Sequence, residues 1–495
     1  MTWPVAGHDA SGAARAAACE GVALRIEAEG VELVRIGWCD LHGVLRGKTL
    51  VAAAVPSALK SGVGLVSTIL LKDTSDKTAY RVFEPGLPEA LPGFGFANNL
   101  VLMPDPASFR VLPWTDRTGW LRAEACFEDG RPVPIDTRRI LQQALQRLAA
   151  AGYGLQCGLE VEFHIYRLSS PDDDPSLDPA RAAWPGEPPA LTMIHPGYNL
   201  LAEGWADMAD EPLRIVQQTA QDLGLPLRSL EIELGPSQVE AVFDPSDALT
   251  AADQMVLFRN GVRQALRRAG YHASFVCRPP FPNVIASGWH LHHSLVDLST
   301  GDNAFQRHAA EPGGGEGDAQ ATLSAIGDRW LAGLLAHGRG MAVFCAPTIN
   351  AYGRFRPNVM APQSLTWGRD NRGAMLRVLG RCGDPATRIE NRIGEPSANP
   401  YLYMAAQIHA GLDGVERGLA SPPATGAPYA SGAAAMLPAS LGEALAALAE
   451  DEALVRAFGP TVVDWLTRVK RSELERHEQA EDKDAWQARE YFSRF

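Results

Sequence analysis

Hydrophobic and polar residues alternate along the first quarter of the chain, where a period of two is typical of half-buried β-strands. The alternation is clearest in three segments, at residues 31–38, 65–71 and 100–103. Turns rich in proline and glycine, such as residues 85–88, separate these pieces. The pattern predicts a small, mostly β domain at 21–130, preceded by a loose lead-in at 1–20.

Beyond residue 130 the apolar period changes to that of helices. A first helix is predicted between an N-cap at Asp136 and a terminating glycine at Gly152. A second is predicted at about residues 250–268, and a third begins at Ser440, where Glu443 completes a capping box.

The domain boundary is expected near residue 130, just before the first helix, which leaves 131–495 as a second, larger domain. A chain of 495 residues exceeds the roughly 250–300 residues at which single cores stop growing. Within the larger domain, residues 169–189 and 299–319 are rich in proline, acidic residues or glycine and predict surface loops.

Composition narrows the class of protein. The formal net charge of −13 argues against a nucleic-acid-binding protein, which normally has a basic face. No apolar run approaches the ~18 residues of a membrane span, and the first residues lack the pattern of a signal peptide. Seven scattered cysteines without a C-x-x-C pair favour a reduced, cytoplasmic enzyme.

Four strand-like segments carry acids and histidines. They contain Glu160 and Glu162; Glu231, Glu233 and Glu240; His290 and His292; and Glu390. Side chains two apart on a strand face the same way, so Glu160 and Glu162 project together, as do His290 and His292. Each segment alone is more often a solvated strand face or a turn. The four together predict a cation site, because clustered like charges repel unless a cation lies between them.

Arginines accompany these acids, at positions 354, 356, 369, 372, 377 and 392. Arg377 lies in apolar sequence, and Arg392 lies two residues from Glu390. Carboxylates with one histidine suit Mg²⁺ or Mn²⁺ better than zinc, and arginine binds carboxylate and phosphate in bidentate fashion. The combination indicates an anionic, phosphorylated substrate and phosphoryl transfer.

In this order the segments resemble the glutamine synthetase family, and the resemblance extends from residues 40–43 through 397–402 to 486–492. It implies an α+β chain with an N-terminal β-grasp domain and a large catalytic domain, in which helices flank an antiparallel sheet. It also implies ATP, two or three Mg²⁺ ions (or Mn²⁺) and stacked rings, usually of twelve subunits, with active sites between neighbours. The reaction would convert the γ-carboxyl group of L-glutamate into an acyl phosphate, which an amine then attacks.

The resemblance also assigns roles to residues. One metal ion would have as ligands Glu162, Glu233 and Glu240, and a second would have Glu160, His290 and Glu390. The nucleotide contacts would be His292 and Ser294, and the phosphate-facing arginines Arg372 and Arg377. The glutamate contacts would include Glu162, Ala286, His290, Arg354 and Arg392. Asp40, lent by a neighbouring subunit, would accept the proton of the amine, so Asp40, Arg372 and Glu390 form the predicted catalytic set.

The chain departs from the family pattern around the amine. Glutamine-forming members carry a glutamate in a flap over the intermediate, here residues 355–362, where this chain has Met360. In the glycine-rich loop before His290, Trp289 is larger or more apolar than the residue that it replaces. Tyr198 aligns with the family's tyrosine near the ammonium site. Because methionine is apolar and flexible, we expect an organic amine, alkyl or aryl, and a γ-glutamyl amide as product.

Four alternatives remain open. An ammonia-using glutamine synthetase is the nearest, and a γ-glutamylpolyamine synthetase is the next. A non-catalytic family member would be expected to lack metal ligands, yet all six predicted ligands are present. A guanidino kinase would be expected to lack the segment around Asp40.

Overall fold

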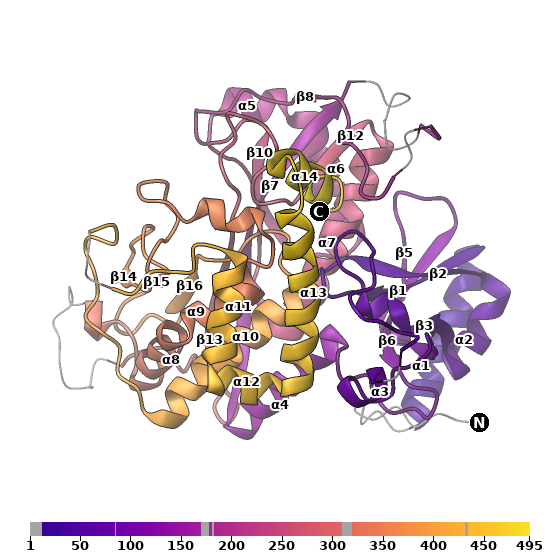
Figure 1. Cartoon of the computed structure of the whole chain (residues 1–495), viewed down its shortest axis with the longest axis horizontal. Helices are drawn as coiled ribbons and strands as arrows, with labels where there is room; N and C mark the ends of the chain where they lie inside the picture. The colour runs from indigo at the N-terminus through magenta and orange to yellow at the C-terminus, as the bar shows by residue number, and fades with distance from the viewer. Residues whose placement is uncertain (1–11, 85, 170–177, 181–182, 309–318, 431–433) are drawn as a thin grey trace.

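Two β-sheets organise the part of the chain that the computed structural model describes, which is residues 12–84, 86–169, 178–180, 183–308, 319–430 and 434–495 (Figure 1). The first sheet contains β1 (Leu33–Cys39), β2 (Leu45–Val51), β3 (Val63–Val66), β4 (Asn99–Pro104), β5 (Arg110–Val111) and β6 (Thr118–Cys126). Its order is β2-β1-β6-β4-β3, with β5 beside β6, and β1 and β6 are parallel while the other pairs are antiparallel. This arrangement supports the predicted β domain, whose assignment as a β-grasp stays a prediction.

The second sheet carries the residues expected to do chemistry. Its strands are β7 (Tyr153–Leu168), β8 (Leu191–Met193), β9 (Leu227–Ile232), β10 (Gln238–Phe243), β11 (Ser246–Asp247), β12 (Tyr271–Ser274), β13 (Trp289–Asp297), β14 (Trp367–Arg369), β15 (Leu376–Leu379) and β16 (Arg388–Asn391). The order is β14-β15-β16-β13-β7-β10-β9, and it is antiparallel except where β14 pairs with β15. The predicted antiparallel sheet flanked by helices is therefore confirmed.

The helices are α1 (Gly12–Ala28), α2 (Val55–Ser61), α3 (Leu87–Ala90), α4 (Thr137–Ala150), α5 (Glu203–Met208), α6 (Asp210–Asp222), α7 (Ala248–Arg268), α8 (Ala325–Ala336), α9 (Gly338–Cys345), α10 (Pro400–Arg417), α11 (Leu441–Glu450), α12 (Glu452–Phe458), α13 (Pro460–Glu478) and α14 (Lys483–Tyr491). Among the described residues, none of these helices combines the length and the apolar character that crossing a bilayer requires.

The predicted helix ends are confirmed. Asp136 accepts the backbone N–H of Arg139 at 3.2 Å and caps α4, and Gly152 follows the helix with a positive φ. The second predicted helix is α7, and the third is α11, where Ser440 Oγ accepts the N–H of Glu443 at 3.2 Å. These ends could be predicted because short polar side chains satisfy the free amides of a first helical turn.

The loose lead-in predicted for residues 1–20 is wrong for residues 12–20, which belong to α1; residues 1–11 lie outside the described part. The small residues there are mostly alanines, the strongest helix formers. Val22 is buried, and Arg15 Nη2 donates to the carbonyls of Leu59 and Pro104 at 3.1 and 3.0 Å. These contacts fix α1 against the first sheet, and the domain limits at 20 and 130 stay predictions.

The predicted surface loops lie only partly among the described residues. Of residues 169–189, the segments 170–177 and 181–182 lie outside them, and of 299–319, the segment 309–318 does. The described remainder consists mostly of turns and coil, as predicted, with isolated β-bridges at Asn303 and Gln306, and Ala319 begins the 3-10 helix η5 (Ala319–Ala321).

The second sheet is amphipathic, and this property positions the site. On β7 the side chains of Leu159, Val161 and Phe163 are buried, and α4 and α7 pack against the strand. The alternate residues of β7 face away from this core. Burying each such apolar side chain contributes about 1.5–3 kcal/mol, so the register that exposes the acids on the other face is strongly specified.

The C-terminal helices connect the two parts. In Figure 1, α13 (yellow) runs down the centre of the view with the first sheet to its right, and α14 lies above it. Trp465 Nε1 on α13 donates to the carbonyl of Leu70 at 2.8 Å, and Arg476 Nε donates to the buried carboxylate of Asp73 at 3.0 Å.

Candidate active site

Neighbouring strands of the second sheet bring the predicted acids and histidines together. Glu160 and Glu162 lie on β7, where Glu162 pairs with Glu240 of β10 and Glu160 pairs with His290 of β13. Residue His292 of β13 in turn lies opposite Glu390 of β16. Four strands therefore supply one polar face, as the alternation in the sequence predicted.

Two overlapping groups on this face could hold a metal ion. They are Glu160, Glu240 and His290, and Glu160, His292 and Glu390, and in each the possible ligand atoms lie within 4.8 Å of one another. Glu160 belongs to both groups, with Oε1 at 3.0 Å from Nε2 of His292 and Oε2 at 3.5 Å from Nδ1 of His290. His292, predicted as a nucleotide contact, thus lies within reach of the metal ligands.

The carboxyl groups on this face have pKa values shifted in opposite directions. Burial raises the pKa of Glu160, but hydrogen bonds with His290 and His292 outweigh it and hold the pKa well below its usual range. Burial and the neighbouring charge of Glu162 raise the pKa of Glu233 to about 7, and the same two causes raise the pKa of Glu240 further. Burial and neighbouring like charges therefore favour the protonated forms of Glu233 and Glu240.

This donor set fits a divalent cation. A cation between the carboxylates would replace the retained protons, and hard ions such as Mg²⁺ prefer carboxylate oxygen. Burial and the charge of Arg392 lower the pKa of His290, which keeps its imidazole neutral and able to act as a ligand. Four predicted ligands, Glu160, Glu240, His290 and Glu390, belong to the two groups together with His292, whereas the predicted ligands Glu162 and Glu233 belong to neither group.

A loop fixes Glu162 from the opposite side. Its Oε2 accepts the backbone N–H of Gly288 at 2.7 Å and the amide of Gln238 at 3.3 Å, and Gln238 also donates to Ser287 Oγ at 3.0 Å. Gln238 stands two residues before Glu240 on β10, so the strand period places both on one face. We did not predict the roles of Gln238 and Ser287, although that spacing could have indicated Gln238.

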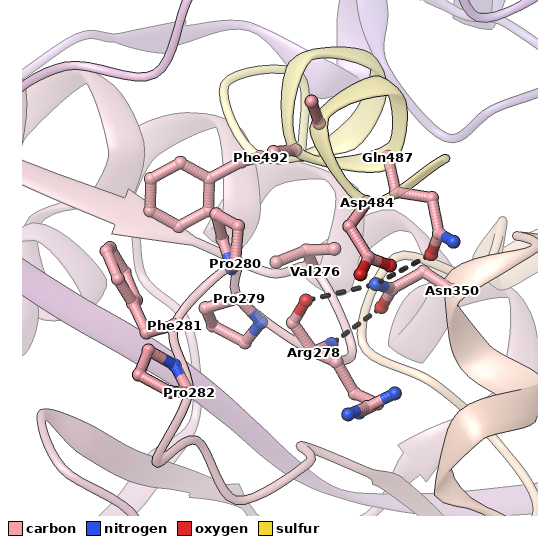
Figure 2. A pocket seen from close by; sticks show the side chains of 12 residues that line it. Val276, Arg278, Pro279, Pro280, Phe281, Pro282, Asn350, Asp484, Gln487 and Phe492 are labelled. Carbon is pink, nitrogen blue, oxygen red and sulfur yellow. Dashed lines mark hydrogen bonds between the residues drawn. The ribbon is translucent and has the colours of Figure 1, made fainter. Parts of the chain in front are cut away.

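The same loop is braced at its base, beside a cavity of about 430 Å³ (Figure 2). Asn350 Oδ1 accepts the N–H of Arg278 at 2.7 Å, and Asn350 Nδ2 donates to the carbonyl of Arg278 at 3.0 Å. Asn350 begins the 3-10 helix η6 (Asn350–Arg354), which ends at the predicted glutamate contact Arg354. The cavity lies outside the acidic face, and its wall connects η6 to the loop that holds Glu162.

Close packing positions Arg354. A Cβ added at Gly288 would lie 2.4 Å from Arg354 Nη2, so only glycine leaves room for this guanidinium. Arg354 Nη1 donates to the carbonyl of Arg392 at 2.9 Å, and its Nη2 lies 3.5 Å from Nε2 of His290. The buried guanidinium of Arg354 thus lies between the loop and the acidic face.

Two arginines flank Glu390. Arg377 Nη1 donates to Glu390 Oε2 at 3.0 Å, and Arg392 Nη1 donates to Glu390 Oε1. Burial raises the pKa of Glu390, but its interactions with His290 and Arg392 outweigh burial, so the pKa is lowered and the ionised carboxylate is favoured. Arg372 is exposed on the loop between β14 and β15, and Ser294 lies on the same face of β13 as His292.

The predicted amine contacts occupy different places. Met360 is half exposed, and its carbonyl accepts from Arg392 Nη2 at 3.2 Å, so the flap reaches the arginine beside Glu390. Tyr198 is exposed, and its hydroxyl donates to the carbonyl of Asn283 at 2.7 Å in the loop that also contains Ala286.

Trp289 does not take the predicted place. It lies on the opposite face of β13 from His290, it is fully buried, and its ring packs edge-on against Tyr403 with centroids 5.0 Å apart. Its predicted contact with the amine is wrong, because successive residues of a strand point to opposite faces.

The structure also places Asp40, the predicted proton acceptor. Its side chain is buried in its own chain, where Oδ1 accepts the backbone N–H groups of His42 and Val44 at 2.9 and 3.0 Å. Oδ2 accepts Arg46 Nε at 2.8 Å and lies 3.5 Å from Arg494 Nη2. These partners engage both oxygens within the chain, and the role of Asp40 at a neighbouring subunit's site stays a prediction.

Comparison with known proteins identifies the family. A model of the glutamine synthetase catalytic domain matches residues 134–491. The chain belongs to the glutamine synthetase family. Its similarity to gamma-glutamylanilide synthase of Acinetobacter sp is 38% identity over 493 residues, with 96% of each chain covered. Gamma-glutamylethanolamide synthetase GlnA4 of Streptomyces coelicolor is 31% identical, with 95% of this chain and 94% of the relative covered.

Solved structures of the glutamine synthetase family agree with the fold. The structure titled apo GmaS superimposes with a TM-score of 0.73 at 29% identity and covers 94% of this chain and 98% of its own. A structure described as a novel glutamine synthase homolog gives 0.74 at 26% identity, with 93% and 99% covered. These similarities extend beyond the catalytic domain to nearly the whole chain.

Proposed function

We propose that the protein is an ATP-dependent ligase that joins the γ-carboxyl group of L-glutamate to an organic amine, with ADP, phosphate and a γ-glutamyl amide as products. The observation that carries the proposal is the face shared by β7, β10, β13 and β16, where clustered acids and two histidines adjoin Arg354, Arg377 and Arg392. Bound divalent ions would offset the charge of the transferred phosphoryl group.

The chain's own residues supply binding and orientation. Arg354 and Arg392 would bind the carboxylates of glutamate, and the exposed Arg372 would approach the phosphates, with Arg377 nearby on β15. His292 and Ser294 share the face that would receive the nucleotide. Arg377 lies on β15, Arg392 directly follows β16 and Arg354 ends η6, so these three guanidinium groups would bind their ligands with little reorganisation.

An apolar acceptor, alkyl or aryl, is supported by Met360. A thioether cannot hold an ammonium ion as a carboxylate does, and methionine adapts to apolar ligands of different shape. The relatives named for anilide and ethanolamide synthesis also use organic amines, according to their names. An arylamine is neutral at pH 7 and needs no base before attack, which agrees with the burial of Asp40 in its own chain.

The finer features of the family extend this proposal. Two or three Mg²⁺ ions, with Mn²⁺ as a substitute, would occupy the acidic face. The subunits would form stacked rings, a dodecamer, in the cytoplasm, with active sites between neighbours. Light scattering after size exclusion would measure the assembly, and a stable monomer that is fully active would contradict it.

The direct test is phosphate release from ATP and L-glutamate, with mass detection of the amide, across a panel of ammonia, ethylamine, isopropylamine, ethanolamine, putrescine and aniline. We expect a monoamine, alkyl or aryl, to give the highest kcat/KM. Equal efficiency with ammonia would indicate a glutamine synthetase, and preference for putrescine would indicate a polyamine ligase. Absence of turnover with every amine would contradict the proposed function.

A further inference from the structure

The tip of the flap is held by two side chains. Arg392 Nη2 donates to the carbonyl of Met360 at 3.2 Å, and Tyr429 Oη donates to the next carbonyl, that of Ala361, at 3.1 Å. Asn358 and Met360 both have positive φ, at 62° and 53°, in a region that residues other than glycine rarely adopt. The tip therefore depends on these contacts to keep its shape.

The residues that directly follow the flap are fixed by backbone hydrogen bonds instead. The N–H of Leu365 donates to the carbonyl of Ala435 at 2.8 Å, and the N–H of Leu437 donates to that of Gln363 at 2.9 Å. These two bonds join the residues that follow the flap to residues 435–437, which precede α11. These bonds lie beyond the tip. Among the described residues, the hydroxyl of Tyr429 links the tip to the segment that precedes α11.

The ring of Tyr429 also reaches the loop that carries Arg372. A Cβ added at Gly373 would lie 3.0 Å from Tyr429 Cε2 and 2.7 Å from Pro428 Cγ, so the ring lies directly against this glycine. Burial raises the pKa of the Tyr429 phenol, which keeps its O–H available as a donor at neutral pH. Tyr429 thus contacts the flap with its hydroxyl and the Arg372 loop with its ring.

We propose that Tyr429 is a positioning residue that holds the flap against the Arg372 loop and so protects the acyl phosphate from water. The inference rests on the proposed function, because it assumes a γ-glutamyl phosphate intermediate. Tyr429 lies in a region rich in alanine and proline without helical or strand periodicity, so the sequence gives no indication of this role.

Two reactions compete for this intermediate. When an amine attacks, a C–N bond forms, the acyl C–O bond to phosphate breaks, and the nitrogen loses a proton. When water attacks, a C–O bond forms and the same bond to phosphate breaks, which returns glutamate and phosphate and releases a proton. A flap that leaves its place admits water, so ATP is consumed without amide formation.

The test is Tyr429→Phe, which removes the hydroxyl and keeps the ring against Gly373. With ATP, L-glutamate and the preferred amine, the amide formed per phosphate released should fall about three- to tenfold, which corresponds to one lost hydrogen bond. The kcat of phosphate release and the KM for ATP should stay within about twofold. A higher amine concentration should restore the ratio, because amine and water compete for one intermediate; a merely structural defect would not respond in this way.

Tyr271→Phe is the matched control. It also removes a phenol hydroxyl that donates to an oxygen, that of Glu211 at 2.6 Å, and it lies on β12. Its ratio of amide to phosphate should equal that of the wild type. If Tyr429→Phe also keeps the wild-type ratio, the inference is overturned and the proposed function stands. If the wild type forms no amide with any amine, the proposed function fails first.

Discussion

At the residue scale, the raised pKa values of Glu233 and Glu240 mean that the charge of these two groups would respond to a bound cation. Burial and Glu162 raise the pKa of Glu233 to about 7, above its ordinary value of 4.5, and the pKa of Glu240 is raised as well. A raised carboxyl pKa means that the folded state keeps protons that the unfolded state has lost. Without metal, stability therefore falls as pH rises from about 4.5 through about 7.

Added Mg²⁺ should reverse this loss. We expect the melting temperature to rise more on addition of Mg²⁺ at about pH 8 than at about pH 6, because protons compete with the cation for these carboxylates. Glu240→Gln should remove most of the Mg²⁺-dependent rise, and Glu231→Gln, its cross-strand neighbour on β9, should retain it. An equal Mg²⁺ effect in wild type and Glu240→Gln, measured by thermal unfolding, would exclude Glu240 as a ligand.

Single residues also show where sequence reasoning succeeded and failed. The period of two that places His290 and His292 on one face of β13 also places Trp289 on the opposite face. The sequence alone could therefore have excluded the predicted contact of Trp289 with the amine. The burial of Asp40 could not be predicted in the same way. Its partner Arg494 lies at the other end of the chain, and its partner Arg46 is not related to it by a strand or helix period. A motif predicts a residue's neighbours along the chain, whereas burial depends on the whole fold.

At the scale of elements, η6 and the loop from Arg278 to Gly288 act as one support for Arg354. Asn350 joins them through two hydrogen bonds to the backbone of Arg278, and Gly288 packs against the guanidinium of Arg354. Helix caps such as Asp136 and Ser440 could be predicted because capping is local. The contact between Asn350 and Arg278 could not be predicted, because the two residues lie 72 positions apart in the sequence.

Asn350→Ala should therefore act on glutamate binding. Losing both hydrogen bonds should cost about 1–3 kcal/mol, and the freed loop should misplace Arg354, which raises the KM for glutamate about tenfold and leaves the KM for ATP within about twofold. Initial-rate kinetics with each substrate varied in turn would measure this. Asn98→Ala, which removes a loop brace in the first domain, should leave both constants unchanged. A uniform rise of both KM values would contradict the role of η6.

At the scale of the whole molecule, a buried histidine connects several C-terminal helices. His337 lies between α8 and α9, and its Nδ1 and Nε2 lie 2.8 and 2.9 Å from Oδ2 of Asp451 and of Asp413. Both ring nitrogens face carboxylates, so the protonated ring can donate a hydrogen bond to each of them. Burial lowers the pKa of His337, but the hydrogen bonds to Asp451 and Asp413 outweigh it and raise the pKa above its usual value of 6.5.

A raised histidine pKa gives stability that is complete below about pH 6.5 and is lost as pH rises through the folded-state value. His337→Gln should therefore lower the free energy of unfolding by about 2 kcal/mol at about pH 6 and by clearly less at about pH 9, measured by urea denaturation. His409 is the matched control: burial lowers its pKa to about 3, so it stays neutral. His409→Gln should cost the same at both pH values, and an equally pH-independent loss for His337→Gln would show that its charge does not stabilise these helices.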